Sequence, residues 1–272
     1  MYSLDEIFGS AVPGPVQLIE TESGAGIRLL IKRDDLLFHP EAPEFCGNKW
    51  RKLKYNLLEA RRMEKGHLLT FGGAFSNHII AVAAAGYLSG FQTTGVIRGE
   101  ADYANNPTLS KAGEYGMNLH FISREEYRQK EDPERLQSLL DRFGDAYIIP
   151  EGGSNAFALK GCEELAREII EDCKGEVPDV VCCSCGTGGT LAGLISGFKG
   201  QTQLIGFPAL KGSFMTAQVK SFLPKEEPGN WSINSDYHFG GYAKHKPELL
   251  NFIQEFYDNH RILPDPVYTG KM

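Results

Sequence analysis

The sequence predicts an α/β fold with parallel sheets, and two observations lead to this expectation. Short apolar runs alternate with longer amphipathic stretches from residue 67 to residue 210. Strands separated by helices of this length are joined by right-handed crossovers and lie parallel in an open sheet. Apolar runs such as HLLTFGG (67–73) also end in glycines directly before a helical stretch. We therefore expect an open α/β architecture.

Periodicity places the individual elements. Strands are expected at residues 67–73, 91–99, 118–123, 146–153, 179–189 with its terminal glycine loop, and 202–210. Helices are expected at residues 76–90, 106–116, 155–173 and 190–199, and at 124–144 with an interruption near Pro133. The sequence contains no internal repeat, low-complexity tract or obvious linker. Any second domain is therefore expected to arise from the chain crossing between sheets.

Composition excludes several classes of function. The chain has 272 residues, 42% of them hydrophobic and 23% charged, which is ordinary for a soluble globular protein of one large or two modest domains. A net charge of −7 argues against nucleic-acid binding, which needs a basic face. No apolar run approaches the roughly 18–20 residues that span a bilayer. The N-terminus lacks the pattern of a signal peptide, so we expect a cytoplasmic protein without membrane contact.

The cysteines do not predict a disulfide framework or a metal site. CCSC at residues 182–185 lacks the second Cys/His pair that a structural zinc site needs. We expect no metal, and we interpret these cysteines as small buried residues at the end of a strand.

A basic cluster occurs in FCGNKWRKLKYN (45–56), where four cations fall within six positions: Lys49, Arg51, Lys52 and Lys54. One interpretation is a solvated helix face whose apolar side packs inward through Trp50, Leu53, Leu57 and Leu58. The other is that one lysine takes part in chemistry and the remaining cations are mostly solvated.

A glycine loop, SCGTGGTLAG (184–193), follows an expected strand and opens an expected helix. Glycines allow inward-pointing amides, the helix N-terminus adds partial positive charge, and Thr187 and Thr190 add hydroxyls. The loop has neither the dinucleotide-binding glycine pattern nor a Walker A lysine. It therefore fits a phosphate monoester, although a plain strand-to-helix turn is the alternative.

A phosphate site together with a reactive lysine is what pyridoxal phosphate requires. The stretch RDDLLFHPEAPEFCGNKWRKLKYNL (33–57) resembles the lysine region of the aminocyclopropanecarboxylate deaminase and D-cysteine desulfhydrase family. These are pyridoxal-phosphate enzymes of the tryptophan synthase β-subunit fold, also called fold type II. The resemblance implies two open, mostly parallel twisted sheets flanked by helices, with the cofactor in the cleft between them and bound to Lys49.

Further segments resemble the same family and imply roles for their residues. In GGAFSNH (72–78), Asn77 would bind the cofactor ring, and Ser76, Asn77 and His78 would bind the substrate, although a capping or packing role for His78 is equally open. PEGGSNAFALKGC (150–162) resembles the family's crossover segment. The phosphate would be bound by Cys185, Gly186, Thr187, Gly188, Gly189 and Thr190. FGGYAK (239–244) and DPVYTGKM (265–272) resemble the segments that supply the active-site tyrosines, here Tyr242 and Tyr268.

The resemblance also implies an organisation for the whole chain. Residues 1–51 and 155–272 would form a large cofactor-binding domain and residues 52–154 a small one, in a homodimer that acts on a small amino acid. Members of the family typically continue beyond the point where this sequence ends. We expect either a truncated sequence or a member that closes its large domain differently.

The reaction is predicted from Thr269, which stands where the deaminases carry a glutamate after the tyrosine. A neutral hydroxyl favours β-elimination over opening of a cyclopropane ring. We expect a D-cysteine desulfhydrase-like lyase that gives pyruvate, ammonia and sulfide, with Lys49, Tyr242 or Tyr268 as the base. The alternatives are aminocyclopropanecarboxylate deamination and a non-catalytic relative of the same fold.

Overall fold

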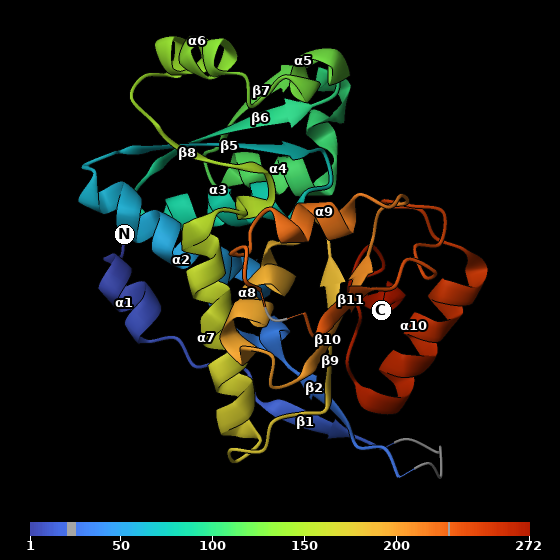
Figure 1. Cartoon of the computed structure of the whole chain (residues 1–272). Helices are drawn as coiled ribbons and strands as arrows, with labels where there is room; N and C mark the ends of the chain where they lie inside the picture. Colours follow the sequence, from blue (N-terminus) through green and yellow to red (C-terminus); the bar gives the residue numbers. More distant parts are fainter. Residues whose placement is uncertain (21–25, 228) are drawn as a thin grey trace. The chain divides into compact units, whose positions relative to one another are not determined.

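The computed structural model describes residues 1–20, 26–227 and 229–272, and the chain divides into two compact units (Figure 1). Unit 1 contains Met1–Gly14 and Asp34–Ala158, and unit 2 contains Pro15–Arg33 and Leu159–Met272. Each unit is therefore built from two separate segments. These boundaries differ from residues 1–51 with 155–272 and residues 52–154, so the large and small domains implied by the resemblance stay a prediction.

Unit 1 is built on a parallel sheet of four strands in the order β7-β6-β5-β8. The strands are β5 (His67–Gly73), β6 (Gln92–Arg98), β7 (Asn118–Ile122) and β8 (Tyr147–Ile149). All three pairs run parallel, and Thr70 of β5 lies between Gly95 of β6 and Ile149 of β8. The parallel sheet predicted for this part of the sequence is confirmed.

Helices cover both faces of this sheet (Figure 1). The helices α3 (Asn77–Ser89) and α4 (Pro107–Glu114) lie on one side, and α5 (Arg124–Arg128) and α6 (Pro133–Phe143) on the other. Side chains of β5 alternate between the two cores, because Leu68 belongs to the α3 side and Leu69 and Phe71 to the α6 side. Burial on both faces explains why this strand is an uninterrupted apolar run.

The N-terminal part of unit 1 adds α1 (Leu4–Gly9), the short antiparallel pair β3 (Phe38–His39) and β4 (Ala42–Cys46), and α2 (Gly47–Arg62). An aromatic cluster joins them. The Phe45 ring stacks on Trp50 at 4.5 Å, and Phe8 meets Trp50 edge-on at 5.3 Å. Trp50, Leu53 and Leu57 are buried, which confirms the predicted inward face of α2.

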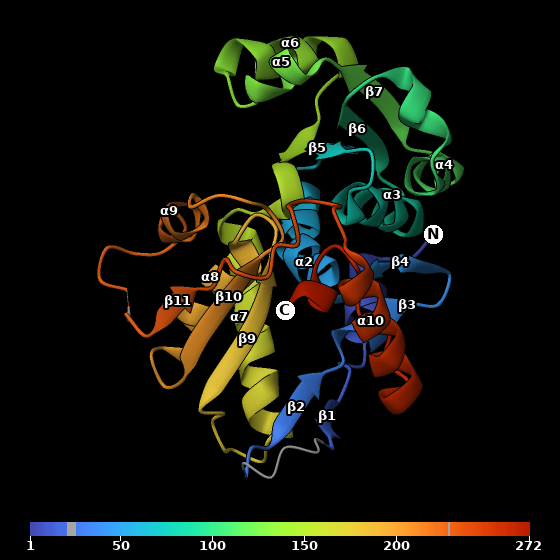
Figure 2. The ribbon, with the colours of Figure 1, turned by 90° about the vertical axis from the view of Figure 1, so that its right-hand side faces the viewer.

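Unit 2 contains a parallel sheet in the order β11-β10-β9, made of β9 (Val180–Cys185), β10 (Gln203–Pro208) and β11 (Trp231–Ile233) (Figure 2). Its core also includes side chains of α7 (Ala156–Asp172), α8 (Gly189–Phe198) and α9 (Met215–Lys220). The antiparallel pair β1 (Val16–Ile19) and β2 (Leu29–Lys32), the helix α10 (Pro247–His260) and the final turn η4 (Thr269–Lys271) complete the unit.

The cysteines of β9 alternate in burial. Cys183 and Cys185 are buried, whereas Cys182 is exposed. The prediction that all of them are buried is therefore wrong for Cys182, because alternate residues of a strand point to opposite faces of the sheet. Among the described residues, no three His, Cys, Asp or Glu side chains gather closely enough to hold a metal ion.

Candidate cofactor site

Lys49 lies in the first turn of α2 and is half-buried. The helix begins two residues earlier, at Gly47. Gly47 has φ +53°, and a Cβ there would lie 3.2 Å from the Asp34 main-chain oxygen, so a glycine suits this tight start. Lys49 Nζ donates to the main-chain oxygen of Gly152 at 3.4 Å.

The two cations that follow are buried, not solvated. Arg51 and Lys52 are each only 2% exposed. Arg51 binds the Asp34 carboxylate with two nitrogens, Nε at 2.9 Å and Nη2 at 2.7 Å. Lys52 Nζ donates to the Gly152 oxygen at 3.2 Å and to Ser154 Oγ at 2.9 Å. The prediction of solvated side chains is therefore wrong for both, because fixed partners compensate the loss of water.

The turn that receives these lysines follows β8. The short helix η3 (Glu151–Gly153) contains Gly152 with φ 68° and Gly153 with φ +72°. Two consecutive residues in the left-handed region favour glycine. The turn is tied to α2 a second time, since Asn155 Nδ2 donates to Asn56 Oδ1 at 2.7 Å and Asn56 Nδ2 donates to the Lys52 oxygen at 2.7 Å. Sequence reasoning did not single out Asn56, which lies seven positions after Lys49.

Ser76 and Asn77 form the start of α3. Ser76 is the N-cap, and its Oγ accepts from the backbone N–H groups of His78 at 3.2 Å and Ile79 at 3.4 Å. Asn77 is the first helical residue. The N-terminus of a helix is a suitable place for a carboxylate. The cofactor role of Asn77 and the substrate role of Ser76 stay predictions.

His78 is buried, with 2% of its surface exposed. Its Nε2 lies 2.7 Å from Thr70 Oγ1, which donates in turn to the Ile149 oxygen at 2.9 Å. Nδ1 has no hydrogen-bond partner among the described residues. Burial lowers the pKa of His78 well below its ordinary value, Lys49 and Lys52 lower it further, and the Pro150 carbonyl opposes the shift. The imidazole is therefore neutral, and its burial favours packing over the substrate contact that stays a prediction.

The predicted phosphate loop connects β9 to α8 in unit 2. Gly188 is the N-cap of α8 in the left-handed region, and a Cβ there would lie 2.8 Å from Val219 Cγ2. A Cβ on Gly186 would lie 3.1 Å from the Tyr268 ring. The left-handed φ and the close contact favour glycine at Gly188, whereas at Gly186 the Tyr268 ring would have to move by a few tenths of an ångström. The loop from Cys185 to Thr190 therefore combines three glycines, two threonines and the N-terminus of a ten-residue helix, which fits a phosphate monoester.

The two tyrosines and Thr269 also belong to unit 2. The rings of Tyr242 and Tyr268 meet edge-on at 6.2 Å. Thr269 Oγ1 accepts from the Asp265 backbone N–H at 2.8 Å. The Asp265 carboxylate accepts from the Tyr268 N–H at 2.9 Å. Asp265 thus fixes the loop that carries Tyr268 and Thr269, a role that the sequence indicated only through an aspartate directly before a proline.

The predicted residues thus fall into two groups, each described within its own unit. Unit 1 brings Lys49, Lys52 and His78 to one glycine turn. Unit 2 brings the glycine loop and Tyr268 together, with Tyr242 against Tyr268.

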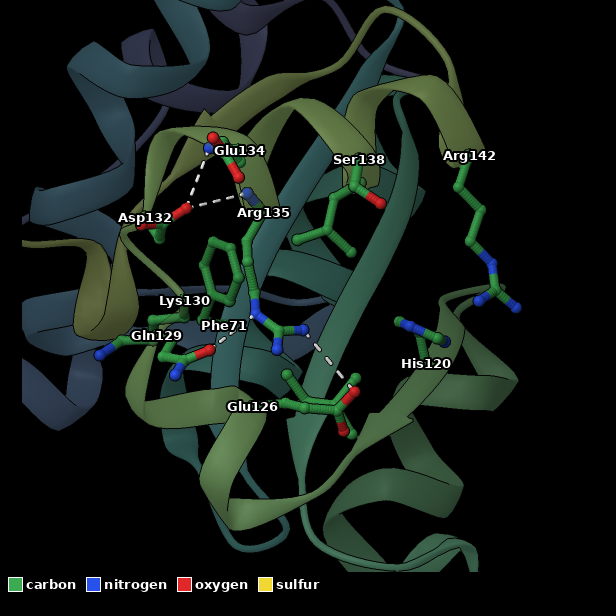
Figure 3. A pocket seen from close by; sticks show the side chains of 12 residues that line it. Phe71, His120, Glu126, Gln129, Lys130, Asp132, Glu134, Arg135, Ser138 and Arg142 are labelled. Carbon is green, nitrogen blue, oxygen red and sulfur yellow. Dashed lines mark hydrogen bonds and ion pairs between the residues drawn. The ribbon is translucent and has the colours of Figure 1, made fainter.

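A pocket of about 660 Å³ in unit 1 lies elsewhere, between α5, α6 and the edge of the sheet (Figure 3). Arg135 crosses it, donating to Gln129 Oε1 at 3.1 Å and pairing with Glu126 at 3.6 Å, while His120 and Arg142 line its other end. None of the residues predicted for the cofactor or the substrate lines this pocket. Its volume alone does not make it the site of chemistry.

Comparison with known families identifies the cofactor. The profile of the family described as "Pyridoxal-phosphate dependent enzyme" matches residues 10–272. The chain belongs to the pyridoxal-phosphate-dependent enzyme family. Its cofactor is pyridoxal phosphate, and it is a lyase. The residues present fit this group, because a glycine loop at a helix N-terminus suits its phosphate and Lys49 offers an amine.

Relatives in this pyridoxal-phosphate family carry two activities in their names. The chain is 30% identical to a bifunctional D-cysteine desulfhydrase/1-aminocyclopropane-1-carboxylate deaminase of Arabidopsis thaliana, over 90% of this chain and 66% of that protein. It is also 30% identical to a D-cysteine desulfhydrase of Klebsiella pneumoniae, over 98% of this chain and 85% of that protein. A crystal structure of an ACC deaminase homologue matches with a TM-score of 0.78 at 24% identity, covering 100% of this chain and 88% of that one. The predicted fold is thereby confirmed.

Across the described residues, no helix is both long and apolar enough to cross a membrane. The cytoplasmic location stays a prediction.

Proposed function

We propose that this lyase catalyses β-elimination from a D-amino acid, with D-cysteine as the reference substrate. The observation that carries the proposal is Thr269, a neutral hydroxyl that the Asp265 N–H fixes directly after Tyr268. Only a carboxylate would offer a compensating charge to a protonated pyridine nitrogen in a partly desolvated site. A hydroxyl at this place favours expulsion of a good leaving group such as sulfide over opening of a cyclopropane ring.

Different residues of the chain would bind the cofactor, accept the proton and bind the substrate carboxylate. When bound, pyridoxal phosphate supplies an electron sink next to the substrate's α-carbon. Lys49 Nζ would hold the cofactor and, after the substrate's amino group has displaced it, accept the α-proton. Ser76 and the amides at the start of α3 would hold the substrate carboxylate. Tyr242 and Tyr268 are the alternative bases.

The overall reaction balances without any further reactant besides water. The Cα–H bond and the Cβ–S bond of D-cysteine break, sulfide leaves with the proton that it needs, and the released enamine takes up water. The products are pyruvate, ammonia and sulfide. No oxidant or reductant is consumed.

The proposal is tested by incubating the cofactor-loaded enzyme with D-cysteine, L-cysteine, D-serine and aminocyclopropanecarboxylate in parallel. Pyruvate or 2-oxobutyrate and, for the cysteines, sulfide are measured. We expect the highest rate with D-cysteine and equal yields of pyruvate and sulfide. Faster release of 2-oxobutyrate from aminocyclopropanecarboxylate than of pyruvate from D-cysteine would overturn the proposal.

Cyclopropane opening is the second candidate, because the Arabidopsis relative carries both activities in its name. The variant Thr269→Glu separates the two. A glutamate beside the pyridine nitrogen would strengthen the electron sink, so we expect the ratio of D-cysteine to aminocyclopropanecarboxylate turnover to fall. An unchanged ratio would mean that Thr269 does not select the reaction.

We also propose a homodimer, as the resemblance implies. It is supported by the exposed leucines Leu18 and Leu30, which are paired across β1 and β2 on one face and are 59% and 36% exposed. Light scattering after size exclusion should give twice the mass of 30.1 kDa. A mass of one chain at micromolar concentration would rule the dimer out.

A further inference from the structure

The loop that carries Tyr242 has an unusual backbone. Of residues 239–243 within the loop 238–244, four have positive φ, namely Phe239 (50°), Gly240 (98°), Gly241 (114°) and Ala243 (54°). Phe239 and Ala243 are not glycines, so this conformation is strained and persists only where surrounding contacts hold it. The question is which contact does so.

Lys271, the last residue of η4, supplies that contact from 30 positions away. It is 3% exposed, and its Nζ donates to the main-chain oxygens of His238 at 3.0 Å and Gly241 at 2.8 Å. The same two oxygens close the turns of the loop, because they accept from the N–H groups of Gly241 at 2.9 Å and Lys244 at 3.1 Å. One ammonium group therefore binds both turns on either side of Tyr242.

Lys271 is also fixed relative to the second tyrosine. Its backbone N–H donates to the Tyr268 oxygen at 3.0 Å, and the Tyr268 ring lies edge-on to the Tyr242 ring. Burial lowers the pKa of Lys271, and Asp265 opposes that shift. A buried cation kept in place by two carbonyls is costly to desolvate and needs these partners.

We propose that Lys271 is a positioning residue for the reaction: it holds the strained loop 238–244 so that Tyr242 is presented against Tyr268. The proposal rests on the proposed function in one respect, the placement of these tyrosines at the substrate. Lys271 itself does not touch the reacting atoms. Its loss removes a restraint on the loop and leaves two carbonyls without their shared donor.

The test compares Lys271→Met, which keeps the length of the side chain but has no donor, with Lys271→Arg, which keeps a cationic donor. The matched control is Lys244→Met, since Lys244 is an exposed lysine of the same loop. Hydrogen exchange is followed in the cofactor-loaded protein at the amides of Gly241 and Lys244. Steady-state kinetics with D-cysteine are then measured on the loaded enzyme.

We expect Lys271→Met to exchange these two amides at least tenfold faster, with amides of α8 unchanged, and to lose at least tenfold in kcat. Lys271→Arg should recover part of both effects, and Lys244→Met should show neither. If Lys271→Met does not fold, Lys271→Gln is compared instead; its shorter amide keeps a donor without the charge, so we expect smaller effects of the same sign on exchange and kcat. Unchanged exchange, or faster exchange with kcat unchanged, would overturn the proposal. If the wild type does not act on D-cysteine, the proposed function fails while the exchange result still decides whether Lys271 holds the loop.

Discussion

Lys49 and Lys52 donate to the same atom, the main-chain oxygen of Gly152. Two consecutive glycines with positive φ, Gly152 and Gly153, build the turn that presents this oxygen. His78 packs behind it, because a Cβ on Gly153 would lie 3.2 Å from His78 Cε1. The position of Lys49, the proposed cofactor lysine, thus depends on a turn about a hundred residues later in the chain.

Replacing Gly153 with alanine tests this dependence. The new Cβ meets His78 and the backbone keeps φ +72°, so we expect unfolding free energy to fall by about 1–3 kcal/mol. Gly113→Ala in α4 is the control, since a Cβ there meets nothing within 4 Å and should stabilise by about 0.5–1 kcal/mol. Urea unfolding of both variants and the wild type gives the changes in the free energy of unfolding. Equal effects of the two changes would show that the turn is not strained.

The buried ion pair of α2 predicts an asymmetric response to mutation. Arg51 is 3% exposed and Asp34 21% in their side chains. Asp34→Ala leaves a buried cation without its partner and should cost about 3–5 kcal/mol, whereas Arg51→Met leaves a carboxylate that water still reaches and should cost less. The control is Glu176→Ala, which breaks the exposed pair with Arg28 and should change stability far less than either substitution. A larger loss from Arg51→Met than from Asp34→Ala in urea unfolding would contradict the burial argument.

Stability should depend on pH through His78. Burial depresses its pKa in the folded state, so the unfolded chain binds a proton near its ordinary pKa of about 6.5 while the folded protein does not. Stability from this group is therefore complete above pH of about 6.5 and is lost as the pH falls, by at most about 1.4 kcal/mol per pH unit. His78→Gln should remove this part of the slope between pH 7.5 and 5.5.

Carboxylates also titrate toward low pH, so the comparison needs a second histidine. His245 is exposed, so His245→Gln is the matched control for the loss of a histidine as such. The free energy of unfolding of each protein is measured in urea at several pH values. If it depends on pH equally in the wild type and in His78→Gln, His78 is protonated in the folded protein.

The glycine loop makes a prediction about the cofactor. Gly188→Ala places a Cβ 2.8 Å from Val219 Cγ2 at φ +79°, so the start of α8 must shift. We expect at least a tenfold weaker affinity for pyridoxal phosphate, measured by equilibrium dialysis. Gly175→Ala has the same kind of strain, at φ +88°, but meets nothing within 4 Å, and should keep its affinity. Equal affinities in the two variants would remove the loop from the cofactor site.

Local sequence patterns were sufficient to predict most helices and strands. The strand β5 and the helix α3 lie where their apolar runs and glycines predicted them, because burial on two faces produces a continuous apolar pattern. The interruption near Pro133 is also real, since Asp132 caps α6 and Pro133 is its first residue. The short antiparallel pairs β1–β2 and β3–β4 were missed, because strands of two to five residues carry too little periodicity.

Long-range contacts set the limit for the site. Motifs identified Lys49, Ser76 and the glycine loop as candidates, but the burial of Lys52 depends on Gly152 and Ser154, about a hundred residues away. A lysine is expected at the surface unless a partner is known, and no local pattern reveals such a partner. The burial of Lys271 could not be predicted for the same reason, because its two acceptors lie in a distant loop with no regular structure.

The most direct measurement is the identity of the lysine that carries the cofactor. Because Lys49 and Lys52 share one acceptor, activity loss alone cannot separate them, whereas chemistry on the protein can. The loaded wild type is reduced with borohydride, digested and mapped by tandem mass spectrometry, with Lys52→Met as the matched variant. We expect the pyridoxyl group on Lys49 in both proteins and none in Lys49→Ala. A label on Lys52 or on any other lysine of the wild type would contradict the assignment.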